Sequence, residues 1–279
     1  MEFGTEAFDD VPVIMSMSSH DPSGSSGIQA DIETAASLGC HCTPIITTLC
    51  AQDTRDTKDI IPIEAALIIE QARAILEDMP VKAIKLGFVG SVENAEAIHS
   101  ILHDYPDLPV ILDPVTSICN SELPEADSVV KATETLLLPQ ATIATLGLVE
   151  THELAHQADT LDACAQEILE TGCEHLLISG AKRTHTTYEN HLYNQQGLKR
   201  KYTWERIKVF SHGCGATLAA SITCYLAHGL RIEDAIEQGQ QFSWHCLANS
   251  RRIGMGNRIP NRFFWTDKNH KSQRKKVLS

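Results

Sequence analysis

Apolar strand-like runs and helix-like segments alternate strictly along residues 11–180. The strand candidates are rich in Val, Ile, Leu and Thr, and apolar residues recur every three to four positions in the helix candidates. The expected strands cover residues 11–17, 42–50, 83–88, 109–114, 141–145 and 175–180, and the expected helices include residues 28–38, 63–76 and a segment that ends at His103. This alternation predicts an α/β fold with three layers, in which helices cover both faces of a mostly parallel central sheet. Ligands gather at the carboxyl ends of the strands in such folds.

The expected domain organisation is simple. Residues 11–265 contain no linker and no internal repeat, so they are expected to form one domain. Residues 191–209 differ from the rest because they resemble antiparallel strands around a turn at Gln195–Gly197. Residues 1–10 and the basic tail at residues 266–279 are expected to be disordered.

Composition narrows the class of partner. The chain has 279 residues, is 43% hydrophobic and carries a formal net charge of −13. This length and apolar content can bury a large core, and the negative charge argues against a nucleic acid or an acidic membrane as partner. No apolar run approaches the ~20 residues of a membrane span. Nine scattered cysteines suit reduced thiols, so a cytoplasmic protein is expected.

A glycine-rich turn precedes a helix-like segment near the C-terminal end. Gly213 and Gly215 are one residue apart, and small helix-forming residues continue to His228. The first amides of a helix are unpaired and lie at its positive end, so Gly213, Cys214, Gly215 and Ala216 are candidates to hold a phosphate. An ordinary tight turn before a packing helix fits these residues equally well. The spacing matches neither the P-loop nor the dinucleotide-binding motif.

Several motifs in register resemble one family. They are His20–Asp31, Thr48–Thr54, Lys85–Ser91, Leu112–Val115, His212–Gly215 and Gly254–Phe263. Over residues 13–265 the chain is similar to the hydroxymethylpyrimidine and phosphomethylpyrimidine kinases of thiamine synthesis, which belong to the ribokinase-like superfamily. The resemblance implies a three-layer ribokinase-like fold, a small pyrimidine ligand and, if the protein is active, ATP and Mg²⁺. It also implies a homodimer, which would cover the edges of the strands at residues 191–209.

The resemblance implies a substrate site as well. Asp31 and Gln52 match residues that border the aminopyrimidine, and an amide complements an amino group beside a ring nitrogen. Phe88 and Val115 match apolar positions that line the pyrimidine pocket. The weaker alternative for the first two makes Asp31 a charge on a helix face and Gln52 a polar residue at a strand end, and the alternative for Phe88 is a core residue.

The expected magnesium ligands are retained, whereas other positions of the phosphotransfer machinery differ. Asp113 and Glu150 match residues that support the metal and phosphate. Ala216 stands where the family has the cysteine that acts as base, Gly147 where it has an asparagine, and Ser179 where it has a lysine. No catalytic residue is therefore assigned.

These departures predict a protein that binds a hydroxymethylpyrimidine-type ligand but whose phosphotransfer is impaired or lost. Phosphoryl transfer depends on positioning and on charge stabilisation, and the departures affect both. The alternative is a working ATP-dependent kinase that uses water or His212 as its base.

One motif points to a different class of enzyme. His152-Glu153-Leu154-Ala155-His156 fits H-E-x-x-H, which on a helix places two imidazoles one turn apart to bind zinc. A zinc protease needs a third ligand and a deep cleft, and the metzincin continuation is absent from the sequence. A surface helix is the better interpretation.

Overall fold

The computed structural model describes residues 10–115 and 125–266. The predicted disorder of residues 1–10 and 266–279 concerns segments that lie outside the described residues, except for Asp10 and Thr266.

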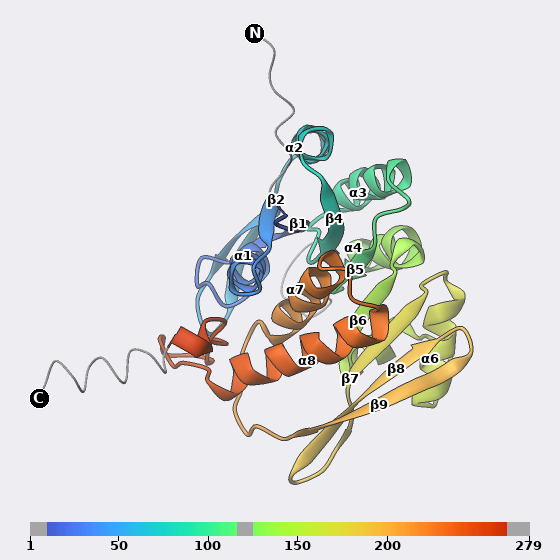
Figure 1. Cartoon of the computed structure of the whole chain (residues 1–279). Helices are drawn as coiled ribbons and strands as arrows, with labels where there is room; N and C mark the ends of the chain where they lie inside the picture. Colours follow the sequence, from blue (N-terminus) through green and yellow to red (C-terminus); the bar gives the residue numbers. More distant parts are fainter. Residues whose placement is uncertain (1–9, 116–124, 267–279) are drawn as a thin grey trace, which may run out of the picture.

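Within the described residues, nine strands form one sheet in the order β3-β2-β1-β4-β5-β6-β7-β8-β9 (Figure 1). The strands are β1 (Val13–His20), β2 (His41–Gln52), β3 (Thr57–Pro62), β4 (Val81–Leu86), β5 (Val110–Leu112), β6 (Ile143–Gly147), β7 (His175–Arg183), β8 (Thr187–Asn194) and β9 (Gly197–Glu205). All pairs from β2 through β7 are parallel, whereas β3, β8 and β9 pair antiparallel. The predicted mostly parallel sheet and the antiparallel hairpin after it are confirmed.

Helices cover both faces of this sheet, which confirms the three-layer α/β fold (Figure 1). The helices are α1 (Gly27–Ser37), α2 (Ala65–Asp78), α3 (Val92–Asp104), α4 (Ala126–Ala132), α5 (Leu148–Leu154), α6 (Leu161–Glu170), α7 (Cys214–Ala227) and α8 (Ile232–Ala248), with a short π turn at Thr133–Leu137 and a 3-10 turn at Leu138–Gln140. One core packs α2, α3, α4 and α6 against the sheet. On the opposite face α1, α7 and α8 pack together.

Alternation of side chains along the central strands explains the two cores. In β1, Met15 and Met17 belong to the core under α2 and α3, while Ile14 belongs to the one beneath α1. In β5, Ile111 packs against α7, whereas Val110 and Leu112 belong to the core on the other face of the sheet. Strands buried on both faces are nearly continuously apolar, which is why they were predictable from sequence.

Two elements were not predicted from the sequence. β3 is an exposed edge strand, so it lacks the alternation of buried and exposed residues that identifies a half-buried strand. The buried face of α8 includes Gly239 and Gln240 beside Ile236 and Phe242, and these two residues interrupt its apolar stripe.

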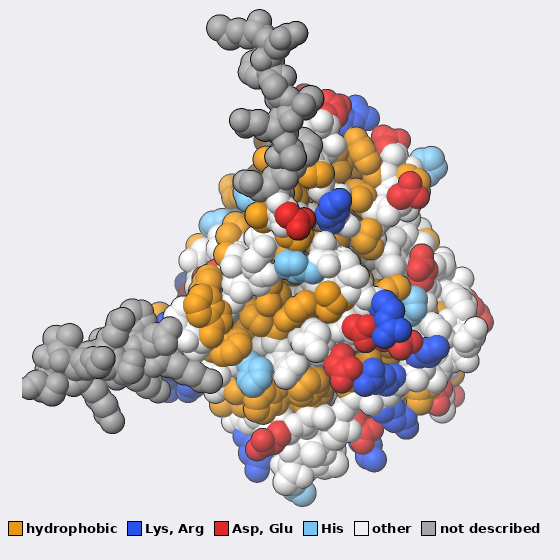
Figure 2. Space-filling view, in the orientation of Figure 1, with side chains coloured by type: hydrophobic (Ala, Val, Ile, Leu, Met, Phe, Trp, Pro, Cys, Tyr) orange, Lys and Arg blue, Asp and Glu red, His pale blue; other side chains and the backbone are white. Residues whose placement is uncertain are grey.

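The outer edge at β9 carries charged residues. Lys199 and Arg200 form ion pairs with Glu233 (3.7 Å) and Glu237 (2.9 Å) of α8. Figure 2 shows basic and acidic side chains side by side on the lower right of this face, where β9 and α8 lie in Figure 1. Charged side chains on an edge strand oppose pairing with another sheet. The homodimer therefore stays a prediction that gains no support from this edge.

Among residues 10–115 and 125–266, no helix combines the length and the apolarity needed to cross a membrane.

Candidate active site at the carboxyl ends of the strands

The glycine-rich turn begins helix α7 where the central strands end. Gly213 is the residue before the helix and has φ +89°. A Cβ at this position would overlap the carbonyl oxygen of Ser25, so both the conformation and the close approach require glycine. The Thr217 amide is bonded to the Gly213 carbonyl at 3.0 Å, and the amides of residues 214–216 precede it at the positive end of α7.

Asp113 follows β5 and faces this turn. A Cβ at Gly215 would lie 3.2 Å from the Asp113 Oδ1. Burial raises the pKa of Asp113 to about 6, the negative charges of Asp31 and Glu150 raise it further, and Lys85 opposes them. Asp113 and Glu150, the two predicted metal ligands, therefore lie close enough at this edge of the sheet for the charge of Glu150 to raise the pKa of Asp113.

The raised pKa of Asp113 predicts a stability change with pH. Its ordinary pKa is 3.8 and its folded pKa is about 6, so folding favours the protonated form and the free energy of unfolding falls as pH rises from about 4 to 6. Asp113→Asn is therefore expected to be more stable than the parent by about 2–3 kcal/mol near neutral pH and equally stable near pH 4. Urea unfolding at both pH values measures this, with the exposed Asp107→Asn as control. Equal destabilisation by Asp113→Asn at both pH values would contradict the assignment.

Asp31 lies inside the protein rather than on an open surface. Its Oδ2 accepts a hydrogen bond from the Ser16 hydroxyl (2.6 Å) and pairs with the Lys85 Nζ (3.0 Å), and Asp31 and Lys85 are fully buried. Ser16 and Lys85 are register partners on β1 and β4. The other carboxylate oxygen, Oδ1, is buried without a hydrogen-bond partner. The alternative of an exposed charge on a helix face is thereby excluded.

Gln52 ends β2 beside a large cavity. The Gln52 Oε1 accepts a hydrogen bond from the Thr57 hydroxyl (3.0 Å), and its Nε2 lies 3.1 Å from the His212 Nε2. The cavity measures about 560 Å³ and lies between the loop after β1, the β2–β3 turn and residues 253–259. Its lining residues are Pro22, Ser23, Gln52, Asp53, Thr54, Arg55, Ile253, Gly254, Met255 and Ile259.

Phe88 and Val115 line a different, smaller cavity together with residues of α4. The Phe88 side chain is 3% exposed and belongs to the core under α2, α3 and α4. Asp31 lies with α1 and α7 on the opposite face of the sheet. The structure thus brings Phe88 and Val115 together but does not bring either to Gln52 or to Asp31.

The three positions where the sequence departs from the family lie around the same edge. The Ala216 side chain is in the first turn of α7 and is buried. A Cβ at Gly147 would overlap the Glu150 Oε2, so the Glu150 side chain fills the space beside this glycine. Ser179 is near the end of β7, and the nearby Lys182 pairs with Glu189 (3.6 Å) on the neighbouring strand.

His212 has the protonation state that a base requires. Burial lowers the pKa of His212; the negative charge of Asp21 opposes this shift, and the positive charge of Arg262 adds to it. The imidazole is therefore neutral at neutral pH. Because the Thr57 hydroxyl donates to the Gln52 Oε1, the Gln52 amide N–H is directed at the His212 Nε2, which accepts the hydrogen bond.

The H-E-x-x-H residues do not form the zinc arrangement that this motif has in zinc proteases. α5 ends at Leu154 and Ala155 is extended, so His156 is not one helical turn from His152. His152 contacts the Cys164 sulfur at 3.6 Å, and His156 lies 3.5 Å from Glu134. Within residues 10–115 and 125–266, no three His, Cys, Asp or Glu side chains are grouped to hold a metal.

Two important residues of this region were not assigned from the sequence, Lys85 and Arg262. Both are essentially buried cations, at 0% and 1% exposure. The signal for Lys85 is its place in an apolar strand, because a buried lysine requires a charged partner. Arg262 lies in irregular backbone after α8, where no periodicity indicates burial.

Comparison with known proteins agrees with this architecture. The family model described as Phosphomethylpyrimidine kinase matches residues 21–261. The hydroxymethylpyrimidine/phosphomethylpyrimidine kinase of Streptomyces coelicolor is 29% identical over 258 residues, which cover 88% of this chain and 92% of that protein.

Two solved structures resemble the fold. A phosphomethylpyrimidine kinase from Clostridium difficile 630 superposes with a TM-score of 0.70 at 26% identity, covering 84% of this chain and 98% of that one. An ADP complex of Bacillus subtilis pyridoxal kinase has a TM-score of 0.81 at 23% identity, with 92% and 99% covered, and shows the fold alone. The family match spans the glycine turn, both carboxylates and Gln52, so the chain belongs to the phosphomethylpyrimidine kinase family.

Proposed function

We propose that this protein binds a hydroxymethylpyrimidine-type ring and that its ATP-dependent phosphotransfer is strongly impaired. Family membership supports the ligand class, since relatives are named hydroxymethylpyrimidine/phosphomethylpyrimidine kinases. The observation that carries the impairment is Ala216: a methyl group in the first turn of α7 cannot accept a proton. A general base contributes ~10²–10⁴-fold to such reactions.

The cavity beside Gln52 is the best candidate for the ring. Its volume suits a small ligand. Ile253 and Met255 line it and are 71% and 76% exposed, so they offer apolar surface that a planar ring would cover. The ring's amino group and ring nitrogen would replace the contact between Gln52 and His212. Phe88 is too buried to stack on a ligand without rearrangement, so we assign it to the core.

Gln52→Ala tests this placement. Loss of the amide leaves the polar edge of the bound ring unpaired, which costs roughly 1–3 kcal/mol. We expect calorimetry with hydroxymethylpyrimidine to give at least about tenfold weaker binding. Gln196→Ala, in the distant β8–β9 turn, is the matched control. Equal affinities of the parent and Gln52→Ala would remove Gln52 from the site.

The residues near the start of α7 suit a magnesium–phosphate group. Asp113 and Glu150 provide the carboxylate oxygens that Mg²⁺ prefers. Burial raises the pKa of Asp113, and the charge of Glu150 adds to this shift. The amides of residues 214–216 would hold a phosphate. When bound, Mg²⁺ would neutralise charge on the phosphates, and the buried Lys85 would limit the net negative charge beneath them.

A working kinase with His212 as base is the second candidate function. The observation that favours it is the neutral imidazole 3.1 Å from the Gln52 amide, two residues before α7. A substrate hydroxyl that takes the place of the amide would meet a nitrogen able to accept its proton. His212→Asn would abolish turnover in that case, and it would leave a slow background rate unchanged in our preferred account.

We also retain the homodimer as a proposal, by analogy with the family. Sedimentation equilibrium of the full chain is expected to give twice the 30.7 kDa chain mass. A single species at the chain mass would contradict it.

A further inference from the structure

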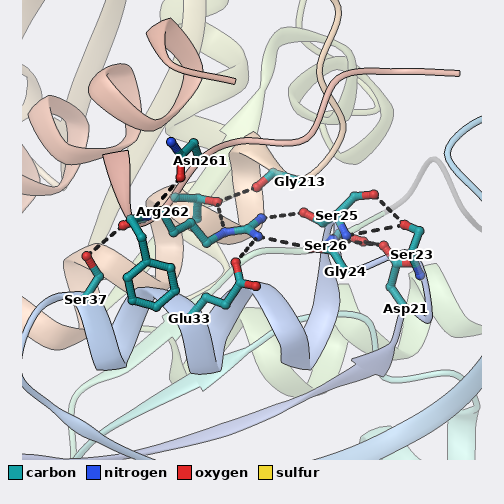
Figure 3. A network of polar contacts seen from close by, with 12 residues as sticks. Asp21, Ser23, Gly24, Ser25, Ser26, Glu33, Ser37, Gly213, Asn261 and Arg262 are labelled. Atoms are coloured by element: carbon teal, nitrogen blue, oxygen red, sulfur yellow. Dashed lines mark hydrogen bonds and ion pairs between the residues drawn. The ribbon is translucent and has the colours of Figure 1, made fainter. Parts of the chain in front are cut away.

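A buried arginine joins three parts of the chain near the proposed phosphate site. The Arg262 side chain is 1% exposed. Its Nε donates to the Thr217 hydroxyl of α7 (3.0 Å), its Nη1 to the Gly24 carbonyl (3.1 Å) and the Glu33 carboxylate of α1 (3.0 Å), and its Nη2 to the Ser25 carbonyl. Figure 3 shows the guanidinium directed toward Ser25 of the Ser23–Ser26 loop, with Gly213 nearby.

The loop that Arg262 contacts is folded around one carboxylate. Asp21 accepts hydrogen bonds from the backbone amides of Ser23 (2.8 Å) and Ser26 (2.9 Å) and from the Ser26 hydroxyl (3.0 Å) (Figure 3). These contacts give the loop its shape but do not attach it to α7. The attachment is made where the Ser25 carbonyl closely approaches Gly213, and Arg262 binds that same carbonyl.

Burying a guanidinium costs desolvation free energy, which the hydrogen bonds of Arg262 must offset. The Arg262 side chain is itself buried, whereas its charged partner, Glu33, is 43% exposed, and the other guanidinium bonds go to backbone carbonyls and to the Thr217 hydroxyl. Several rigidly oriented donors on one plane are a property of arginine that lysine does not share. Removing them would take the Arg262 donors from the buried Ser25 carbonyl and from the half-buried Gly24 carbonyl.

We propose that Arg262 is a positioning residue: it holds loop 21–26 against the first turn of α7 and thereby sets the anion site at residues 213–216. The anion part of this inference rests on the proposed function, whereas the loop part does not. Arg262 contacts no expected ligand atom, and it acts through the backbone of the loop and through Thr217.

Arg262→Lys tests the proposal, because it keeps the charge and loses the planar set of donors. Arg258→Lys is the matched control, since the Arg258 guanidinium bonds the Ser250 hydroxyl and carbonyl, away from the loop. Two quantities are measured on the full chain: amide hydrogen exchange in residues 21–27 and 214–217, and calorimetric affinity for inorganic pyrophosphate. We expect exchange in both segments to rise at least about tenfold in Arg262→Lys, with β4–β6 unchanged, and pyrophosphate binding to weaken at least about tenfold.

A second experiment adds millimolar guanidinium to Arg262→Ala, to replace the missing side-chain group. Guanidinium is expected to restore protection of the loop in Arg262→Ala and to change nothing in Arg258→Ala, which a purely global loss of stability would not produce. Unchanged exchange in Arg262→Lys, or exchange that rises equally in β4–β6, would overturn the proposal. If the parent binds no pyrophosphate, the proposed anion site fails, and the exchange and guanidinium experiments still decide the role of Arg262 in holding the loop.

Discussion

A variant that carries Ala216→Cys, Gly147→Asn and Ser179→Lys together is expected to phosphorylate hydroxymethylpyrimidine more than about a hundredfold faster than the parent. The three changes restore a base, support for metal and phosphate, and a cation near the phosphates. Groups that act as a unit are strongly non-additive, so the triple gain should exceed the product of the single gains. Product formation under saturating ATP and Mg²⁺ is measured for the parent, the triple variant and the three single variants.

Gly147→Asn is the change that requires a side chain to move. The Glu150 carboxylate occupies the space beside Gly147, so an asparagine there must displace the end of this flexible side chain. Ala216→Cys alone is expected to gain little, because a thiolate needs a phosphate already held in position. A full gain from Ala216→Cys alone would show that the remaining machinery is intact, against the present account.

Lys85→Met is expected to destabilise the protein by about 3–5 kcal/mol, the usual cost of leaving a buried charge without its partner. Lys85 is 0% exposed and pairs with Asp31 at 3.0 Å, and its charge also lowers the pKa of Asp113. Its loss leaves two buried carboxylates near each other. Urea unfolding near neutral pH measures the change in the free energy of unfolding.

Lys82→Met is the control on the same strand, because Lys82 is exposed and should change stability by less than about 0.5 kcal/mol. A double variant, Lys85→Met with Asp31→Asn, is expected to recover part of the lost stability. Equal stability of Lys85→Met and Lys82→Met would show that the buried ion pair contributes nothing to the folded state.

Much of the fold was predictable because the central strands are buried on both faces. β1, β4 and β6 are buried along almost their whole length, and the apolar residues on both of their faces favour a covered parallel sheet. β3 was not predictable, since its residues are mostly exposed and its pairing depends on the preceding turn around Asp53. α8 was missed because its buried face includes Gln240, which bonds Asn190 and Trp204.

The motifs of the site were predictable from the sequence, but the face of the sheet on which each site residue lies was not. The sequence predicts that Gly213 lies in a turn before a helix and that Asp113 lies at the end of a strand. The structure confirms both and places the two residues at one edge of the sheet. The partner of Asp31 is Lys85, 54 positions away, and no local pattern reveals such a pairing. Phe88 lies beyond the last residue of β4, so the alternation of the strand could not tell which face it joins.

The rate of phosphorylation by the unmodified chain tests the central claim most directly. The measurement is the initial rate of product formation from hydroxymethylpyrimidine under saturating ATP and Mg²⁺. The loss of the base alone predicts a rate below ~0.01 per second, at least about a hundredfold under the ~1 per second that is ordinary for kinases. A rate near ~1 per second that disappears in His212→Asn would contradict the account and make the protein a working kinase.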